Sequence, residues 1–459
     1  MFENILGQTA ADQLKHDIKN GCLAPAMLFE GPLSSGKGSA ALELGRVISC
    51  EKDAAWSCSC PSCSRHRMLL HPDMLCMGNR SFYAEIAAAS NVFLREKTSG
   101  SAGILFIRSV RKLLSRFNPV LWEDEPKFSK LAPLAASIED GIDEITAATG
   151  KPENNQDAAG MDNLTKLTVS IVKNAFKLES DGMPDLIPIA WIRRAAYWCR
   201  LAPSGKEKLL LIENADRMQE SARNSLLKLL EEPPDTVKII LTSNRPKTIL
   251  LTVLSRLRPY RFMQRSAETE REVLRRVFRS ENFTPENPDV KQASGSLINA
   301  YLDSFLPVPG PELRALAAYF AASAAYSAAL LRRKKGAAGL PGELVQLGKY
   351  ASSAASASGL EKTGNGKEAA ATVLAKAYDF EIRSLFTEFN RDLLDIVLES
   401  QKKPLPDSIE SEDSTVIDFL EIWRTCTGEC EEAAMVYNQS IPLVLEQLFI
   451  RAGRKMAEM

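Results

Sequence analysis

The stretch that decides the fold is Ala24–Cys50, which reads APAMLFEGPLSSGKGSAALELGRVISC. It begins with a short apolar run, which predicts a buried strand that ends at Gly31. The residues from Ser35 onward predict a helix, so a glycine loop joins the strand to the helix. Within that loop four residues separate Gly31 from Gly36, and Lys37 follows directly. This order of elements and residues predicts a phosphate-binding loop.

One position departs from the phosphate-loop pattern. The residue after the lysine should be Ser or Thr, whose hydroxyl binds magnesium, but here it is Gly38. Ser39 follows one place too late and could replace that hydroxyl only if the loop shifted by a residue. Two interpretations stay open: the loop binds a nucleotide weakly, or it is a strand–helix turn without a ligand.

The chain of 459 residues is 45% hydrophobic and 25% charged, which indicates a globular protein of roughly three domains. Its formal net charge of −1 excludes a broad basic field, so any nucleic acid must contact a local patch. The N-terminal residues lack the basic region and apolar core of a secretory signal. The uncharged run 315–331 is rich in alanine, serine and tyrosine, which predicts a packed helix rather than a membrane span. We therefore expect a cytoplasmic location and no membrane partner.

Strands and helices alternate on both sides of a long interruption. Apolar strands are predicted at 73–77, 208–216 and 237–244, and helices at 191–199 and 221–232. Such alternation predicts a parallel sheet with helices on both faces, in which ligands bind at the carboxyl ends of the strands. The residues expected at those ends, beside the glycine loop, are Glu213, Asn214, Ser243 and Asn244.

After about residue 263 the predicted strands stop and helical patterns take over. We predict an α/β module over residues 1–262, a small helical domain over 263–308 and an all-helical domain over 309–459. The module contains a helical insertion at about 105–186, and the sequence does not indicate its role.

Four of the nine cysteines lie close together within 50–63, namely Cys50, Cys58, Cys60 and Cys63. Four neighbouring thiolates suit tetrahedral Zn²⁺ and leave no coordination position open, so we predict a structural zinc site. The single residue between Cys58 and Cys60 is a short spacing for zinc, and unliganded thiols are the alternative.

Several motifs in one order give the chain a family resemblance. The glycine loop, the four cysteines, "HPD" at 71–73, the acidic strand at 208–216 and the segment 226–256 resemble the bacterial DNA polymerase III clamp-loader subunits of the AAA+ class. The resemblance covers residues 1–80 and 187–300, and LLKLLEEPPDTVKIILTSNRPKTILLTVLSR is its most specific part. It implies an AAA+ P-loop module, a helical lid and an all-α C-terminal collar. It also implies a pentameric ring with gamma/tau and delta subunits, which loads the sliding clamp onto primer-template DNA.

The family contains ATP-hydrolysing motor subunits and a delta-prime subunit that is largely inert toward ATP. Where motors carry a magnesium-binding hydroxyl, an Asp-Glu pair and a sensor arginine, the resemblance places Gly38, Glu213-Asn214 and Ile298. Because neutral Asn214 cannot act as a base, the chain resembles delta-prime, a DNA polymerase III holoenzyme component with absent or weak ATPase activity. A gamma/tau-type motor that uses Ser39 and Glu213 is the alternative. The degenerate nucleotide site implied here comprises Gly31, Gly36, Lys37, Gly38, Ser39, Glu213, Asn214 and Asn244.

Arg256 matches the arginine of the family's Ser-Arg-Cys motif, with Leu257 in place of the cysteine. The resemblance implies a trans-acting arginine finger, a guanidinium that reaches the γ-phosphate of ATP bound by the neighbouring subunit. A surface arginine paired with a carboxylate is the other interpretation.

One basic helix favours a different function. Arg108, Arg111, Lys112 and Arg116 lie close together in the predicted insertion and could contact DNA phosphates. A DNA-binding module that has kept an AAA+ shell is therefore a second alternative. A solvated charged face is the commoner origin of such a pattern.

Overall fold

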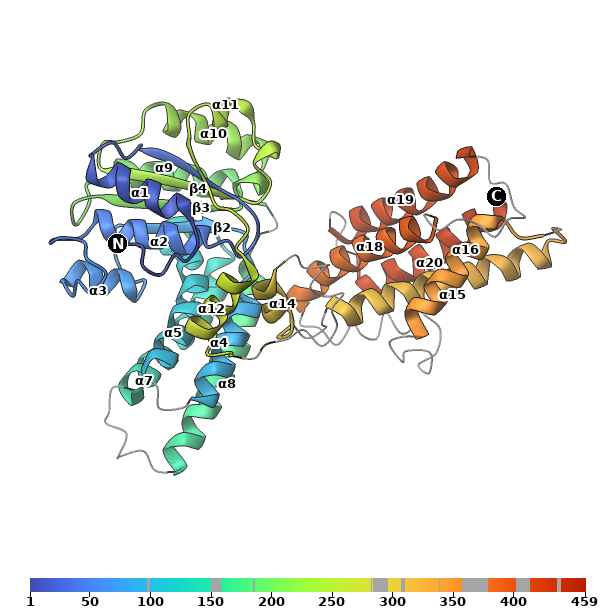
Figure 1. Cartoon of the computed structure of the whole chain (residues 1–459), viewed down its shortest axis with the longest axis horizontal. Coiled ribbons are helices and arrows are strands. Elements are labelled where there is room, and N and C mark those ends of the chain that lie inside the picture. The colour runs from blue at the N-terminus through green and yellow to red at the C-terminus, as the bar shows by residue number, and fades with distance from the viewer. Residues whose placement is uncertain are drawn as a thin grey trace. The chain divides into compact units, whose positions relative to one another are not determined.

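The structure of the chain is a computed structural model that divides into two compact units, Met1–Phe305 and Leu306–Met459, drawn in Figure 1. It describes residues 1–96, 100–149, 158–184, 186–281, 283, 296–306, 310–337, 339–356, 379–401, 413–435 and 439–459.

A parallel sheet organises the first unit. In the part of the chain that the structure describes, five strands pair in the order β2-β3-β4-β1-β5, and every neighbouring pair is parallel. The strands are β1 (Ala26–Glu30), β2 (Met74–Gly78), β3 (Lys208–Glu213), β4 (Val237–Ser243) and β5 (Arg258–Arg261). The predicted α/β fold with a parallel sheet is confirmed.

The sequence did not predict β5, which lies at the edge of the sheet. Three of its four residues are exposed, and it contains Pro259, which only an edge strand accepts easily. The buried residue is Tyr260, whose hydroxyl donates to Asp17 Oδ2 over 2.6 Å. An exposed strand lacks the apolar run that marks the buried strands, so periodicity alone could not reveal it.

Helices cover both faces of the sheet. Leu209, Leu211 and Ile240 share one buried cluster with Ala40 and Leu44 of the helix that follows the glycine loop. Because successive strand residues alternate between faces, Leu210 and Ile212 of β3 point to the opposite face, where α9 packs. The helices of this part are α1 (Thr9–Lys19), α2 (Lys37–Ile48), α3 (Pro61–Arg67), α9 (Ile189–Arg200), α10 (Glu220–Glu231), α11 (Leu251–Leu254), η3 (Ala215–Arg217) and η4 (Pro246–Thr248).

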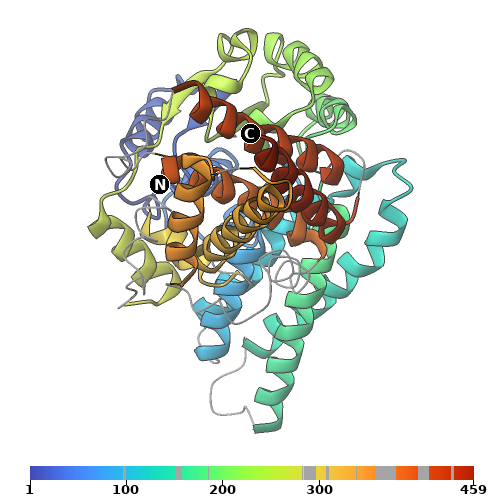
Figure 2. The same ribbon diagram turned by 90° about the vertical axis from the view of Figure 1, so that its right-hand side faces the viewer.

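The segment between β2 and α9 is helical, and Figures 1 and 2 both show its two longest helices side by side. Its elements are α4 (Tyr83–Arg95), α5 (Gly100–Leu114), η1 (Ser115–Phe117), α6 (Pro119–Trp122), α7 (Phe128–Thr149) and α8 (Ala158–Gly182). Near the sheet, the backbone N–H of Phe82 donates to Glu179 Oε1 of α8 over 2.9 Å. Both residues are buried, so this bond fixes the start of α4 against the end of α8.

Two helices that follow β5 are joined to each other and to the glycine loop by polar contacts. They are α12 (Ala267–Phe278) and α14 (Leu297–Asp303). The buried Glu270 carboxylate accepts from Ser296 Oγ over 2.8 Å and from the Leu297 N–H over 2.6 Å. Ser34 of the glycine loop donates to the Asn299 side chain, so α14 contacts the loop directly.

The second unit is all-helical in its described residues. Its helices are α15 (Gly310–Lys334), α16 (Gly342–Ser356), α18 (Asp379–Gln401), α19 (Asp413–Met435) and α20 (Ile441–Glu458). Phe320, Phe389, Trp423 and Leu448 meet in its core. Among the described helices, one segment, Glu312–Lys334, is long and apolar enough to span a membrane by length and composition. One side of it is buried in this core, as in the central helix of a helical bundle.

We expect Glu179→Gln to change how stability depends on pH. Burial raises the pKa of Glu179 from 4.5 to about 7. The folded chain therefore binds more protons than the unfolded chain between these values. The free energy of unfolding should fall by about 3 kcal/mol as the pH rises through that window. Glu179→Gln should remove this slope, as measured by urea denaturation at a series of pH values.

The matched control is Glu123→Gln, because Glu123 is exposed. This control should keep the wild-type slope. An unchanged slope in Glu179→Gln would show that the buried carboxyl is not the group responsible.

Candidate functional site

Close backbone packing requires glycine at residue 31, and a positive φ requires it at residue 36. Gly31 has φ +149°, and a Cβ there would lie 2.1 Å from the carbonyl oxygen of Phe262. Gly36 has φ +97°, and a Cβ there would lie 2.5 Å from Arg265 Nη2. Both glycines would therefore be needed even in a loop that binds no phosphate.

Lys37 folds into the loop that precedes it. Its Nζ donates to the Gly31 carbonyl over 2.6 Å, to the Pro32 carbonyl, and to Ser35 Oγ over 3.2 Å. Burial, reinforced by the nearby positive charge of Arg80, lowers the pKa of Lys37 to about 8. The ammonium group thus satisfies carbonyl oxygens inside the loop where a phosphate-loop lysine would face a phosphate.

Glu213, at the carboxyl end of β3, is held by two guanidinium groups. Arg116 Nη2 bonds to its Oε2, and Arg80 Nη1 lies 3.5 Å from its Oε1. Burial opposes ionisation of Glu213, but Arg116 and then Arg80 outweigh it, so its pKa is lowered. A Cβ on Gly38 would lie 2.9 Å from Glu213 Oε1, so this carboxylate reaches the position of the missing hydroxyl side chain.

Several groups around Arg116 fix its position. The indole N–H of Trp122 donates to its carbonyl over 2.8 Å, and its Nη1 donates to Ser115 Oγ over 2.9 Å. The guanidinium carbons of Arg116 and Arg80 each lie 5.2 Å from the centre of the Phe82 ring. Arg116 is only 2% exposed, so its side chain is part of the interior.

Other residues expected at the nucleotide site follow the carboxyl ends of β3 and β4 or lie in neighbouring helices. Asn214 follows β3 with φ 52° and ψ 51°, a left-handed conformation that asparagine tolerates better than most residues. Asn244 follows β4, and Ser39 lies in the first turn of α2. Ile298 is buried at the start of α14 and offers no group that could contact a phosphate. Asn214 and Asn244 thus lie at the carboxyl ends of neighbouring strands, and Ser39 lies at the start of the helix after the glycine loop.

The basic residues of α5 point into intramolecular contacts. Arg108 donates to the Arg67 carbonyl, and Lys112 pairs with Glu85. Arg111 is 5% exposed and lies 3.5 Å from Glu139. Since Arg116 is also engaged, these four cations do not form the free surface that the DNA-binding alternative requires.

The four clustered cysteines are buried, and their sulfur atoms all lie within 4.8 Å of one another. Cys50 Sγ is 3.7 Å from Cys58 Sγ and 3.9 Å from Cys60 Sγ. Four sulfurs at the usual zinc–sulfur distance in a tetrahedron are about 3.8 Å apart, so the donor set fits such an ion. The short spacing between Cys58 and Cys60 is therefore compatible with a metal site.

Nearby donors fix the cysteine cluster. Arg46 Nη1 donates to Cys63 Sγ over 3.1 Å, and the Cys63 N–H donates to Cys60 Sγ over 3.4 Å. Burial raises the pKa of Cys63 to about 12, whereas at Cys60 backbone N–H groups outweigh burial and lower the pKa to about 6. The cluster follows the C-terminus of α2, about 18 Å from the loop at its other end. Such a metal would serve the fold rather than the loop.

The residues of "HPD" hold loops together. His71 Nδ1 accepts from the Asp73 N–H over 3.2 Å, so its Nε2 carries the proton and donates to Ser62 Oγ over 3.1 Å. The Asp73 carboxylate accepts from the Ser204 N–H over 2.8 Å and the Gly205 N–H over 2.7 Å. These bonds join the cysteine segment and the start of β2 to the turn before β3.

Arg256 follows α11 near the surface. Its Nη2 donates to Glu231 Oε1 over 2.7 Å, and its Nη1 donates to the Thr252 carbonyl over 2.7 Å. The side chains of Arg256 and Glu231 are 34% and 48% exposed. In this chain alone Arg256 is a surface arginine paired with a carboxylate, and it does not contact the glycine loop.

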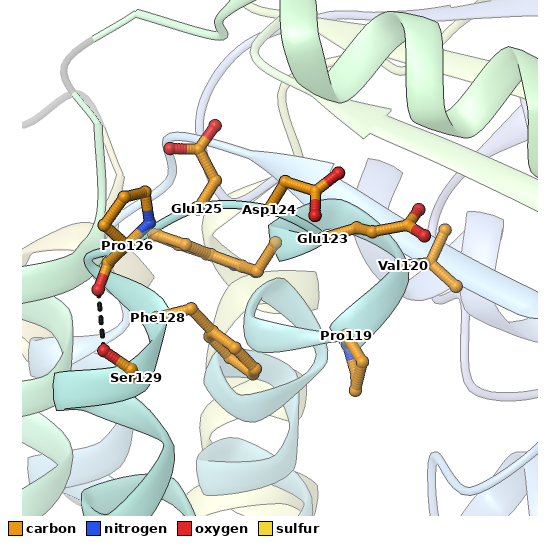
Figure 3. Close-up of a pocket in the computed structure, with 9 residues that line it drawn as sticks. Pro119, Val120, Glu123, Asp124, Glu125, Pro126, Phe128 and Ser129 are labelled. Atoms are coloured by element: carbon orange, nitrogen blue, oxygen red, sulfur yellow. Dashed lines mark hydrogen bonds between the residues drawn. The ribbon is translucent and has the colours of Figure 1, made fainter.

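Figure 3 shows an open hollow beside α6 and the start of α7, away from the loop. Trp122 lines it and also supports Arg116, while Glu125 at its rim lies 3.2 Å from Arg194 Nη1. The hollow brings together none of the predicted site residues. Its other principal lining residues are Pro119, Glu123, Asp124 and Phe128.

Sequence reasoning missed the partners of Glu213. Arg80 follows β2 by two residues, and Arg116 lies in η1, two residues after the end of α5. The basic run was visible in the sequence, but its spacing indicates only that these residues share a region of the helix. Only the tertiary structure brings Arg116 to a carboxylate at the end of β3.

Comparisons with known proteins agree on one family. A family profile described as DNA polymerase III, delta subunit, matches residues 7–118 and 152–266. The chain is 31% identical over 150 residues to DNA polymerase III subunit tau of Escherichia coli, covering 30% of this chain and 23% of tau. It is 32% identical over 111 residues to DNA polymerase III subunit delta' of Bacillus subtilis, covering 22% of this chain and 34% of delta'. The chain therefore spans about a quarter to a third of the length of these curated relatives.

A solved structure is also similar, a DNA polymerase III gamma subunit-related protein of Thermotoga maritima. The match covers 59% of this chain and 81% of that chain, with 18% sequence identity. Its TM-score is 0.26, which is too low for comparing the two folds.

We expect Gly31→Ala to destabilise the chain by about 2–5 kcal/mol, because the added Cβ meets the Phe262 carbonyl and the backbone conformation disfavours a side chain. Chemical denaturation of both proteins measures the difference. The control is Gly21→Ala, where φ is +65° but nothing lies within 4 Å, so only about 1 kcal/mol should be lost. Equal losses in the two variants would contradict a packing role for Gly31.

Proposed function

The chain belongs to the clamp-loader AAA+ family of bacterial DNA polymerase III, and from that membership we propose that it is a delta-prime-like subunit. In this role it supports loading of the sliding clamp onto primed DNA during replication. The observation that carries the proposal is that the Glu213 carboxylate is occupied by cations of the chain itself. Its carboxylate is bound by Arg116 and Arg80, and Gly38 leaves no hydroxyl beside it.

The parts needed for hydrolysis are absent from their expected positions. Gly38 supplies no magnesium-binding hydroxyl, Asn214 no base and Ile298 no sensor charge. Loss of a general base alone typically costs about 10²–10⁴-fold in rate. The combination supports a subunit with absent or weak ATPase activity, rather than a gamma/tau-type motor.

The proposed partners follow from the family. They are the gamma/tau and delta subunits in a pentameric ring, the sliding clamp, and primer-template DNA bound through the assembled complex. The curated relatives are named tau and delta', two different subunits of DNA polymerase III. The proposed place of action is the cytoplasm. We do not propose that the cations of α5 and η1 bind DNA directly, because their side chains make contacts within the chain.

Arg256 is the proposed arginine finger for ATP bound by a neighbouring subunit. Its pair with Glu231 is partly exposed, and such pairs contribute only about 0–1 kcal/mol, so release toward a phosphate costs little. Arg256→Ala should lower turnover at the served site by roughly 10³-fold or more. The measurement is the DNA-stimulated ATPase rate of the reconstituted complex, with gel filtration to establish that the variant still assembles.

The matched control is Arg258→Ala, two residues away and also exposed, which should leave that rate unchanged. An unchanged ATPase rate in a complex assembled with Arg256→Ala would contradict the arginine-finger role of Arg256. Substantial ATP turnover by the isolated chain, abolished by Lys37→Ala, would instead favour the motor alternative.

The cysteine cluster holds one structural Zn²⁺ in the proposed function. Cys50, Cys58, Cys60 and Cys63 supply all four ligands, so the ion supports the turn between α2 and α3 and leaves no position open for substrate. Lys206 Nζ donates to the Cys50 carbonyl over 2.7 Å, which extends this support to the segment before β3.

Purified chain should contain one zinc per molecule by elemental analysis. Removing it with a chelator should lower the free energy of unfolding by about 3 kcal/mol or more, because the folded state holds the metal better than the unfolded state. Cys60→Ser should lose the zinc, whereas the control Cys22→Ser, at an exposed thiol, should keep it. Full stability without metal would contradict the zinc assignment.

A further inference from the structure

Glu213 and residue 38 face each other where a phosphate loop normally holds a divalent cation. In such loops a Ser or Thr hydroxyl and an acidic residue of a neighbouring strand position Mg²⁺. Here Gly38 offers no oxygen, and both carboxylate oxygens of Glu213 already face guanidinium groups, those of Arg116 and Arg80. Mg²⁺ requires a near-octahedral set of oxygen ligands. Gly38 and Glu213 therefore cannot supply the free oxygen ligands that Mg²⁺ requires.

We propose that the Arg116 guanidinium, assisted by Arg80, takes the place of the divalent cation at Glu213 and excludes Mg²⁺ from the loop. A phosphate compound that enters this loop would then bind without metal. The inference concerns the same loop as the proposed function and gives a physical reason for its lack of hydrolysis. It is tested on the isolated chain, whereas the arginine-finger role needs the reconstituted complex, so either can fail alone.

Charge at the site supports this exclusion. Glu213 is accompanied by Arg116, Arg80 and Lys37. Although Asp216 and Glu213 favour the protonated ammonium of Lys37, burial and the Arg80 charge outweigh them and lower its pKa. Glu85 balances part of this positive charge through Arg80 and Lys112, at 2.5 Å from Arg80 Nη2. A dication placed beside Glu213 would meet two guanidinium groups at close range, and their repulsion is strong in a buried site.

The geometry also makes the arginine a permanent occupant. Its backbone is fixed by the Trp122 indole and its side chain by the Phe82 ring and Ser115. A bound ion exchanges with solvent, but a covalently attached guanidinium does not leave. Glu213 would therefore keep one geometry whether or not a nucleotide is present.

The experiment replaces the internal cation and offers a metal instead. Arg116→Met leaves Glu213 without its main partner, so the midpoint of thermal unfolding should fall. Millimolar Mg²⁺ should then raise that midpoint by about 2–4 °C, because the ion fills the vacated position. Wild type and Arg116→Met/Glu213→Gln should not respond. The matched control is Arg111→Met, which breaks a contact between α5 and Glu139 of α7 and should show no rescue.

A second measurement uses the wild-type chain and does not depend on the variant folding. Titration with Mn²⁺ in the presence of ATP, followed by electron paramagnetic resonance, should reveal no bound ion that depends on Glu213. One Mn²⁺ per chain that is lost in Glu213→Gln would overturn the proposal. An absence of Mg²⁺ rescue in folded Arg116→Met would overturn it as well, leaving Arg116 an ordinary buried ion pair.

Discussion

The buried ion pair between Arg116 and Glu213 is the interaction on which the site depends. Their side chains are only 3% and 6% exposed, so each charge requires the other. Removing one partner of such a pair typically costs about 3–5 kcal/mol, because the other charge stays buried and uncompensated. The pair joins η1, directly after α5, to the carboxyl end of β3. It therefore couples the helical segment to the carboxyl ends of the strands, where ligands of this fold class bind.

Packing explains why a phosphate-type loop persists beside such a pair. Gly31 passes against the Phe262 carbonyl, Gly36 lies against Arg265, and Lys37 satisfies carbonyls of its own loop. These contacts stabilise the strand–loop–helix turn without any ligand. These packing contacts do not involve a hydroxyl at residue 38. The glycine motif can thus be retained for the fold even in a chain that, as proposed, does not hydrolyse ATP.

The sequence predicted what local patterns determine. Apolar strands gave the parallel sheet, and the spacing of four cysteines gave a cluster whose sulfurs do converge. It could not predict β5, whose residues are mostly exposed, nor the partner of Arg116, which lies 97 residues away along the chain. Helical periodicity placed the basic residues of α5 in one region, and DNA contact or a solvated face were both compatible with that pattern. Only the tertiary contacts show that these cations point inward.

The contrast between two arginines follows from burial. Arg116 is enclosed and its pair with Glu213 lacks the solvent that would screen or replace it, so exchanging partners is costly. Arg256 is about a third exposed and its pair with Glu231 is weak, so water can compensate when it leaves. In the proposed function, the chain has a fixed cation beside its own loop and an exchangeable one, Arg256, at its surface. Nucleotide binding in the chain would change little, whereas a phosphate presented by a neighbour could compete for Arg256. That division of roles requires no catalytic group in the chain's own loop, which is consistent with Gly38 and Asn214.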